Sequence, residues 1–214
     1  PEVTVRTVNL AKGEQFGETY TAINPNQKIP ALVDGERCIM ESGAILQYLA
    51  EKFPTGLLPS GDARWDVLPW LYWQVANVGP VFGNKLAYTR YLGDVPDEQK
   101  AHPLERFDKE ARRLAGVLEH QLAGRDFVCG DCFTIADIAL YPWLRGWKWS
   151  KVDLTDRPNV LAWIDRVRAR PGVERGLAYG VPQDEIDRWS PERRAQYSRS
   201  GASIASNTRL RSDV

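Results

Sequence analysis

Hydrophobic residues follow two different periods along this chain of 214 residues. Up to about residue 40 they alternate with polar residues in short runs, and beyond residue 62 they recur every three to four positions. A period of two is typical of strands, and a period near 3.6 is typical of amphipathic helices. Residues 54–61 (PTGLLPSG) separate the two patterns and are rich in Pro and Gly, as linkers are. The chain is therefore predicted to have an α+β fold, with a small mixed domain before an all-helical one.

The mixed domain is predicted to contain a strand, a weak helix, a hairpin and a final helix. Their expected positions are residues 2–8, 12–20, 31–33 with 37–40, and 42–53. Asp34-Gly35, between the two hairpin strands, is a strong two-residue turn signal. Ser42 is predicted to be the N-cap of the final helix. One face of that helix is apolar and carries Ile45, Leu46, Leu49 and Phe53.

The helical domain opens with a long apolar and aromatic stretch over residues 63–91. Proline inside a helix removes a hydrogen bond and bends the helix, at a cost of about 3 kcal/mol. We therefore expect two segments with a bend at Gly79-Pro80, and we expect Pro69 in a first turn, where it costs little. Further helices are predicted over residues 104–118, 134–144 and 159–169. The polar tail beyond residue 180 is expected to lie on the surface or to fray.

Residues 133–138 (FTIADI) predict where the third of these helices begins. Thr134 can accept from the backbone N–H of Asp137, and Asp137 can accept from the N–H of Thr134, which makes a capping box. Phe133 and Ile138 take the two positions of a hydrophobic staple. Such caps stabilise a helix start by about 1–2 kcal/mol. We therefore expect this segment to serve folding and to take no part in chemistry.

Composition and charge narrow the class of protein. The chain is 43% hydrophobic and 26% charged, as soluble globular proteins are, and its 28 basic and 28 acidic residues cancel. Nucleic acids and anionic membranes attract a concentrated positive face, so neither is expected as a partner. No apolar run approaches the roughly 20 residues of a membrane span. Three cysteines do not make a disulfide framework, so the cytoplasm is the expected compartment.

Cys129 and Cys132 form a C-x-x-C pattern. Redox motifs of this spacing place the first cysteine at a helix start, whereas here the predicted cap is Thr134, beyond both thiols. One such pair also supplies only two of the four ligands of a structural zinc site. We therefore expect neither redox nor metal chemistry from this pair. Cys38, on a predicted strand, is expected to be a small core residue.

Four segments resemble one family when taken together and in order. NPNQKIPALVD, MESGAILQYLAEKFP, FTIADIALYPW and RPGVERGLA are similar to motifs of cytosolic glutathione transferases, over residues 3–181. WQVANVGPVFGNKLAY resembles the bacterial branch that includes the nu class and the glutathione-dependent disulfide-bond oxidoreductases. The resemblance implies a thioredoxin-like domain over residues 1–54, an all-helical domain over 62–180 and an extension over 181–214. It also implies a homodimer in which the glutathione site faces the partner.

One departure from the family stands out. Members of this family begin with a strand and a helix that precede the segment matching residues 2–8. The side chain that faces the glutathione sulfur follows that first strand. Pro1 comes too late for the chain to contain it, so the catalytic residue is unknown and is expected upstream of Pro1. The thioredoxin-like domain is accordingly expected to be incomplete here. The alternative is a naturally truncated, non-catalytic relative.

The resemblance implies a glutathione site. Ile29-Pro30 matches the family's cis-proline, whose neighbour pairs through its backbone with the cysteinyl unit of glutathione. Ser42 and the helix amides behind it would take the γ-glutamyl carboxylate, and Glu41 would take the ammonium. Lys28 would pair with the glycyl carboxylate.

Two further residues are implied at this site. Gln15 stands where this branch places a glutathione-contacting glutamine. Arg113 could reach the glutathione of the partner subunit, or could equally pair with a neighbouring carboxylate.

The second substrate is expected between the domains, where Trp73, Asn84 and Tyr88 are the main candidate contacts. The alternative for each aromatic residue, and for Tyr141, Trp143 and Trp147, is a place in the core.

The implied function is that of a glutathione-dependent transferase or disulfide-bond reductase. Glutathione is the co-substrate, no metal is expected, and the bound thiolate attacks a disulfide or an electrophilic carbon. Such chemistry belongs to detoxification, and disulfide reduction is slightly favoured by the branch resemblance. Two alternatives stay open: a glutathione-transferase fold that binds or assembles without turnover, and a helical unit that serves only dimerisation.

Overall fold

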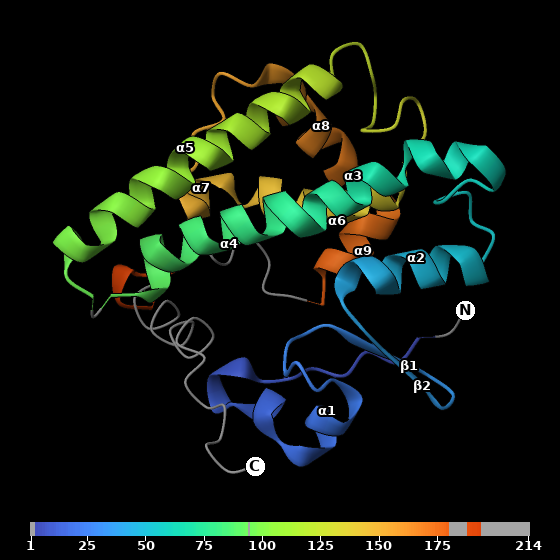
Figure 1. Ribbon diagram of the computed structural model, residues 1–214, viewed down its shortest axis with the longest axis horizontal. Helices are drawn as coiled ribbons and strands as arrows, with labels where there is room; N and C mark the ends of the chain where they lie inside the picture. The colour runs from blue at the N-terminus through green and yellow to red at the C-terminus, as the bar shows by residue number, and fades with distance from the viewer. Residues whose placement is uncertain (1–2, 94, 180–187, 194–214) are drawn as a thin grey trace.

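The computed structural model describes residues 3–93, 95–179 and 188–193 (Figure 1). Its strands are β1 Ala31–Asp34 and β2 Arg37–Met40. The helices of the first domain are α1 Glu18–Ile23 and α2 Ser42–Lys52. The others are α3 Leu68–Trp73, α4 Gly79–Leu86, α5 Asp97–Gln121, α6 Ile135–Arg145, α7 Trp147–Ser150, α8 Pro158–Arg168 and α9 Pro171–Leu177. Most of the tail beyond residue 180 lies outside these ranges, so the expectation for it stays untested.

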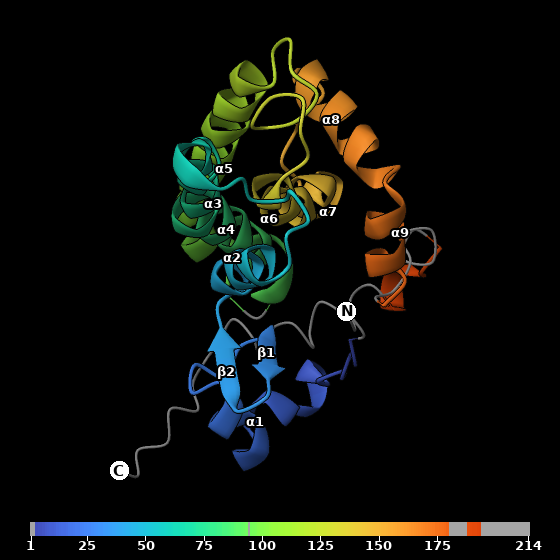
Figure 2. The ribbon, with the colours of Figure 1, turned by 90° about the vertical axis from the view of Figure 1, so that its right-hand side faces the viewer.

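The predicted hairpin forms the sheet of the first domain. β1 and β2 pair antiparallel, from Ala31 opposite Met40 to Asp34 opposite Arg37. Figure 2 shows this ribbon between α2 and α1. Tyr48 of α2 donates its hydroxyl to Asp34 Oδ2 at 2.7 Å, and Lys52 contacts the same oxygen. These contacts attach α2 to the turn end of the ribbon.

Two predictions for the first 20 residues are wrong. Residues 3–8 are not a strand, because their backbone pairs with no strand in the described part of the chain, and Val3 and Val5 are 65% and 51% exposed. The expected helix over residues 12–20 is divided. Two 3₁₀ turns, Leu10–Lys12 and Glu14–Phe16, come first, and α1 follows. Gly13 causes the division, because its φ of 74° is left-handed and ends a right-handed helix.

The start of α2 also differs from the prediction. Glu41, not Ser42, occupies the N-cap position, and its φ of 68° is unusual for a residue with a side chain. Ser42 is the first helical residue. Gly43 lies against the second domain, where an added Cβ would be only 2.9 Å from Val75 Cγ2. Leu46 of α2 packs against the helical core as well, so α2 joins the two domains.

A nearly continuous helical rod opens the second domain. α3 and α4 follow one another with the π-helical turn Gln74–Val78 between them, and a second π-helical turn, Ala87–Tyr91, ends the rod. Pro69 lies in the first turn of α3, as expected. Pro80 likewise lies in the first turn of α4. The interruption expected at Gly79-Pro80 thus takes the form of one wide turn, which lets the chain continue past the proline.

The core of the second domain lies among the rod, α5, α6 and α8. The three helices predicted there are confirmed, with α6 and α8 within a residue of their expected positions and α5 longer at both ends. Seven residues of α6 are buried, and Trp163 of α8 is fully buried against them. α7 and α9 were not predicted. In the described residues no helix is both long enough and apolar enough to cross a bilayer.

The capping box at the start of α6 is confirmed. Asp137 Oδ2 accepts from the backbone N–H of Thr134 at 2.9 Å. Its Oδ1 accepts from Trp163 Nε1 at 2.8 Å and from the N–H of Val128 at 3.0 Å. Burial raises the pKa of this carboxyl, while the four hydrogen bonds that it accepts act in the opposite direction. Every contact of Asp137 is therefore internal, which agrees with a structural role.

Candidate functional site

The register of the ribbon brings the two halves of the predicted site together. Ala31, the first residue of β1, is opposite Met40, the last residue of β2. Ile29-Pro30 therefore enters the ribbon at the end where Glu41-Ser42 leaves it. Neighbouring strands are about 4.8 Å apart, so the two dipeptides are close neighbours. The Ile29-Pro30 peptide bond is cis, as predicted.

The loop before Pro30 is held by hydrogen bonds that the sequence did not reveal. Asn24 Nδ2 donates to the Lys28 carbonyl at 2.6 Å, and the Tyr20 hydroxyl donates to the same carbonyl at 2.7 Å. Asn24 is 2% exposed although it begins a turn. Asn24-Pro25-Asn26 has the composition of a turn, which gives no sign of this burial. The available signal was a polar residue, Asn24, four positions before Lys28.

The open end of α2 presents exposed polar groups. The side chains of Glu41 and Ser42 are exposed, and Glu41 makes no capping hydrogen bond to the helix. The first amides of a helix have no partner inside it, and they carry the positive end of the helix dipole. An anion can therefore bind at this end, with the Glu41 carboxylate beside it for a cation.

Two further predicted residues of this domain differ in how far they are buried. Lys28 is half-buried and directly precedes Ile29 in the chain. Gln15 is 3% exposed on the 3₁₀ turn Glu14–Phe16, and its Oε1 accepts no hydrogen bond from the described residues. A buried amide oxygen without a donor is costly, so this group is suited to accept one.

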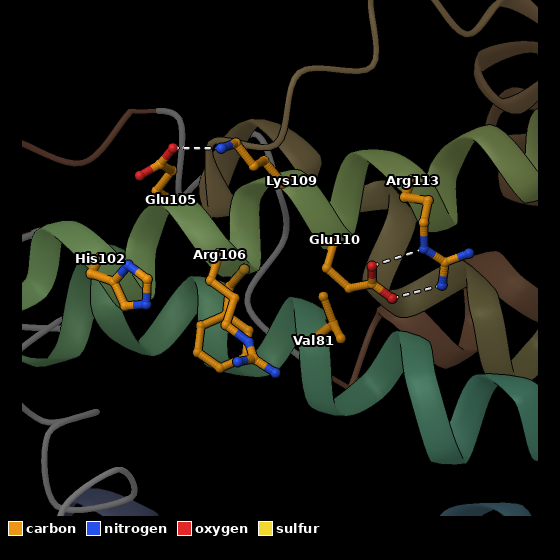
Figure 3. Close-up of a pocket in the computed structure, with 8 residues that line it drawn as sticks. Val81, His102, Glu105, Arg106, Lys109, Glu110 and Arg113 are labelled. Carbon is orange, nitrogen blue, oxygen red and sulfur yellow. Dashed lines mark hydrogen bonds and ion pairs between the residues drawn. The ribbon is translucent and has the colours of Figure 1, made fainter.

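Arg113 lies on α5, and Figure 3 shows its guanidinium facing Glu110 on the same helix. Its Nε and Nη2 donate to the Glu110 carboxylate at 2.8 and 2.6 Å. Of the two possibilities left open by the sequence, the structure shows the pairing with a neighbouring carboxylate. A cavity of about 740 Å³ adjoins this pair and is lined by Val81, His102, Glu105, Arg106, Phe107, Lys109, Glu110 and Arg113.

The three candidate contacts of the second substrate are distributed along the rod. Trp73 packs edge-to-face on Trp70 at 5.2 Å, and Tyr88 stacks on Phe107 at 5.8 Å. Asn84 is exposed and donates to the carbonyl of Pro80 at 2.8 Å. At 1.5 Å per residue, Trp73 and Tyr88 are about 22 Å apart along the rod, so one small molecule reaches only part of the set.

The three further aromatic candidates meet the core to different degrees. Tyr141 is 4% exposed and packs edge-to-face on Trp163. Trp143 and Trp147 are partly buried and pack against the core.

The cysteines have different environments. Cys129 is partly buried, and burial raises the pKa of its thiol to about 11, so it is a poor nucleophile near neutral pH. Cys132 is exposed in the same loop. Cys38 is also exposed, contrary to the expected core position, because it lies with Val33 on the face of the ribbon that the described residues leave open. No group of three or more His, Cys, Asp or Glu suited to a metal occurs in those residues.

Comparison with known protein families gives two matches that follow the domain order. Residues 2–51 match the model "Glutathione S-transferase, N-terminal domain", and residues 75–171 match "Glutathione S-transferase, C-terminal domain". The chain is 38% identical over 187 residues to the disulfide-bond oxidoreductase YfcG of Escherichia coli (strain K12), covering 83% of this chain and 84% of that protein. It is 36% identical over 180 residues to YghU of the same organism, another disulfide-bond oxidoreductase, covering 79% and 61% of the two.

Solved structures agree in fold with the chain. A glutathione transferase family member from Pseudomonas fluorescens pf-5, with two glutathione bound, superposes with a TM-score of 0.75 at 36% identity and 79% coverage of both chains. A glutathione transferase from Pseudomonas putida, with one glutathione disulfide bound per subunit, gives 0.73 at 33% identity, covering 83% of this chain and 80% of that one. The predicted order of a thioredoxin-like domain and an all-helical domain is confirmed.

Proposed function

The chain belongs to the glutathione S-transferase family, and on that premise we propose that it binds glutathione and directs its thiolate at disulfides or electrophilic carbons. The observation that carries the proposal is the ribbon register, which joins Ile29-Pro30 to Glu41-Ser42 at one end of the sheet. The two disulfide-bond oxidoreductases among the relatives favour disulfide reduction over conjugation.

Each part of glutathione has a complementary group at this end of the sheet. The backbone N–H and C=O of Ile29 pair with the extended cysteinyl unit, as an added strand would. Ser42 and the first amides of α2 bind the γ-glutamyl carboxylate, which the helix dipole also attracts. Glu41 binds the γ-glutamyl ammonium, and Lys28 pairs with the glycyl carboxylate. The ligand is thus held at both ends and in the middle.

Gln15, Arg113 and the rod residues take supporting roles in this proposal. The unsatisfied Oε1 of Gln15 accepts a hydrogen bond from the peptide. Arg113 reaches from α5 to the glutathione of the partner subunit, after giving up its contact with Glu110. Trp73, Asn84 and Tyr88 are candidate contacts for a small hydrophobic or disulfide substrate.

The chemistry depends on the ionisation of the glutathione thiol. A free thiol has a pKa near 8.5, so only a few per cent is thiolate at pH 7. Bound thiolate attacks one sulfur of a disulfide, forms a mixed disulfide with glutathione and releases the other sulfur as a thiolate. A second glutathione thiolate then resolves the mixed disulfide to glutathione disulfide and frees the remaining thiol. In conjugation, the same thiolate displaces a leaving group from carbon. We assign no side chain to the sulfur.

We place the chain in the nu class, with domains over residues 1–54 and 62–180 and an extension over 181–214. The assembly is a homodimer in the cytoplasm, and its role is detoxification. Light scattering tests the assembly, since a monomer of 24.2 kDa at working concentration would contradict it.

Calorimetry with glutathione and with glutathione disulfide tests the binding part of the proposal. Saturable binding at or below millimolar concentration is expected, and its absence would reject the function. Turnover is tested separately with hydroxyethyl disulfide and with an aryl halide. Faster reduction of the disulfide supports the reductase, and faster conjugation supports the transferase. Binding without either reaction would instead indicate a glutathione-binding protein without turnover.

A further inference from the structure

Two side-chain donors converge on one backbone oxygen beside the proposed glutathione site. Asn24 Nδ2 and the Tyr20 hydroxyl lie 2.6 and 2.7 Å from the carbonyl oxygen of Lys28. Tyr20 belongs to α1, and Asn24 is the C-cap of that helix. A carbonyl has two lone pairs, and both are occupied here. The direction of this carbonyl is therefore fixed from two sides.

The rest of the loop reinforces that arrangement. Asn24 Oδ1 accepts from the N–H of Asn26 at 2.9 Å, and the Asn24 carbonyl accepts from the N–H of Gln27 at 3.0 Å. Gln27 has a φ of 55°, and its Nε2 donates to Thr21 Oγ1 at 3.0 Å. Asn26, Gln27 and Lys28 are thus each tied to α1 or to Asn24 itself.

The consequence for Ile29 follows from peptide geometry. The C=O of Lys28 and the N–H of Ile29 belong to one planar peptide unit, in which the two bonds point in opposite directions. Hydrogen bonds that fix the carbonyl therefore also fix the direction of the Ile29 N–H. That N–H is the donor assigned above to the cysteinyl unit of glutathione.

We propose that Tyr20 and Asn24 are positioning residues that aim the Ile29 N–H at glutathione. The inference rests on the proposed function and names residues that act on the ligand only through the Lys28–Ile29 peptide. Burial raises the pKa of the Tyr20 hydroxyl, so this group stays protonated and able to donate at neutral pH. Because the same peptide carries the Lys28 side chain, the arrangement also holds the group proposed for the glycyl carboxylate.

Tyr20→Phe removes one of the two donors and leaves the ring in place. Loss of a positioning bond is expected to raise the Kd and the KM for glutathione about five- to tenfold, with kcat unchanged within about twofold. Tyr48→Phe is the matched control, since the Tyr48 hydroxyl makes a bond of the same 2.7 Å length to Asp34, at the other end of the ribbon. The two variants should have similarly reduced melting temperatures, but only Tyr20→Phe should lose glutathione affinity.

A second variant and a second ligand sharpen the test. Asn24→Asp keeps the acceptor for Asn26 and replaces the donor, so it should weaken glutathione binding more than Tyr20→Phe. γ-Glutamylcysteine lacks the glycyl carboxylate that Lys28 is proposed to bind. Because Tyr20→Phe loosens the peptide that carries Lys28, this variant should show a smaller preference for glutathione over the dipeptide. If the unmodified protein binds glutathione, and Tyr20→Phe and Tyr48→Phe both bind it as tightly as the unmodified protein does, the inference is wrong although the proposed function holds. If the unmodified protein does not bind glutathione, both are wrong.

Discussion

At the scale of single residues, Ser42 offers the most direct test of the recognition proposal. Its hydroxyl is exposed at the first helical position of α2, where the proposal gives it the γ-glutamyl carboxylate. Ser42→Ala should weaken glutathione binding about tenfold, the effect of losing one hydrogen bond to a charged group. Calorimetry gives the affinity directly.

Ser60 provides the control for that measurement. Like Ser42, it is exposed at the start of a helical segment. It occupies the N-cap position of the 3₁₀ turn Gly61–Asp66 and makes no capping hydrogen bond. Ser60→Ala should bind glutathione like the unmodified protein. Equal affinity in Ser42→Ala would remove the hydroxyl from the binding site.

The cysteines give a second test at this scale. The raised pKa of Cys129, about 11, leaves roughly one thiol in a thousand ionised at pH 8, so alkylation there should be very slow. Cys38 and Cys132 are exposed. Mass spectrometry after brief treatment with iodoacetamide should therefore find two adducts on the folded protein and three in urea. Rapid addition of a third adduct to folded protein would contradict the burial of Cys129.

The same thiols bear on function. A Cys129→Ser, Cys132→Ser variant should retain the thiol-transfer rate of the unmodified protein, because neither sulfur has a place in the proposed reaction. A large loss of rate with an unchanged melting temperature would instead show that the C-x-x-C pair takes part.

At the scale of elements, the N-terminus of α8 is capped by a carboxylate from another helix. Glu119 of α5 accepts from the N–H groups of Asn159 and Val160 at 3.1 and 2.9 Å. Glu119→Gln replaces one of these oxygens with an NH₂ group that opposes an N–H. The free energy of unfolding in urea should fall by about 1–2 kcal/mol. Glu36→Gln, at an exposed turn position, should change it little, and equal effects would exclude this cap.

Elements were predictable from sequence where their signals are local. The helix over 135–145 was located within one residue because Thr134 and Asp137 cap it and its apolar residues repeat regularly. The strand expected at residues 2–8 failed because alternation records only a tendency, and a strand also needs a neighbour to pair with. The π-helical turns on either side of α4 were not predicted. A π-helical turn holds one more residue than an α-helical turn, and the composition of the segment does not reveal that additional residue.

At the scale of the whole molecule, Gly43 tests how closely the two domains pack. Alanine is a better helix former by about 1 kcal/mol, but its Cβ would lie 2.9 Å from Val75 Cγ2 across the domain contact. Val75 is β-branched and moves little. Gly43→Ala should therefore lower the free energy of unfolding by about 1–3 kcal/mol.

Gly116, inside α5, is the matched control. An added Cβ there meets its nearest neighbour, Arg157 Nη2, at an ordinary 3.8 Å, so Gly116→Ala should stabilise the protein. Adding Val75→Ala to Gly43→Ala should recover part of the loss. Stabilisation by Gly43→Ala alone would show that the domains are not in close contact at this point.

The assembled site could be predicted only in part. Ile29-Pro30, Glu41 and Ser42 are candidates because a family pattern gives each a place, and the ribbon register brings them to one end of the sheet. The hydrogen bonds from Tyr20 and Asn24 to Lys28 were not found, because they depend on how α1 folds back on the loop. Cys38 is exposed although its place on a strand predicted a core position, because the exposed face of the ribbon depends on what packs against it.

The backbone of Glu41 shows a conflict between folding and recognition. A residue with a side chain at φ 68° costs of order 1–3 kcal/mol, and glycine would avoid this penalty. A chain selected for robustness alone would have glycine there, yet this chain has the carboxylate that the proposal gives to the ligand's ammonium. On the proposed role of Glu41, local strain is retained at the position whose charge meets the ligand, at the expense of stability.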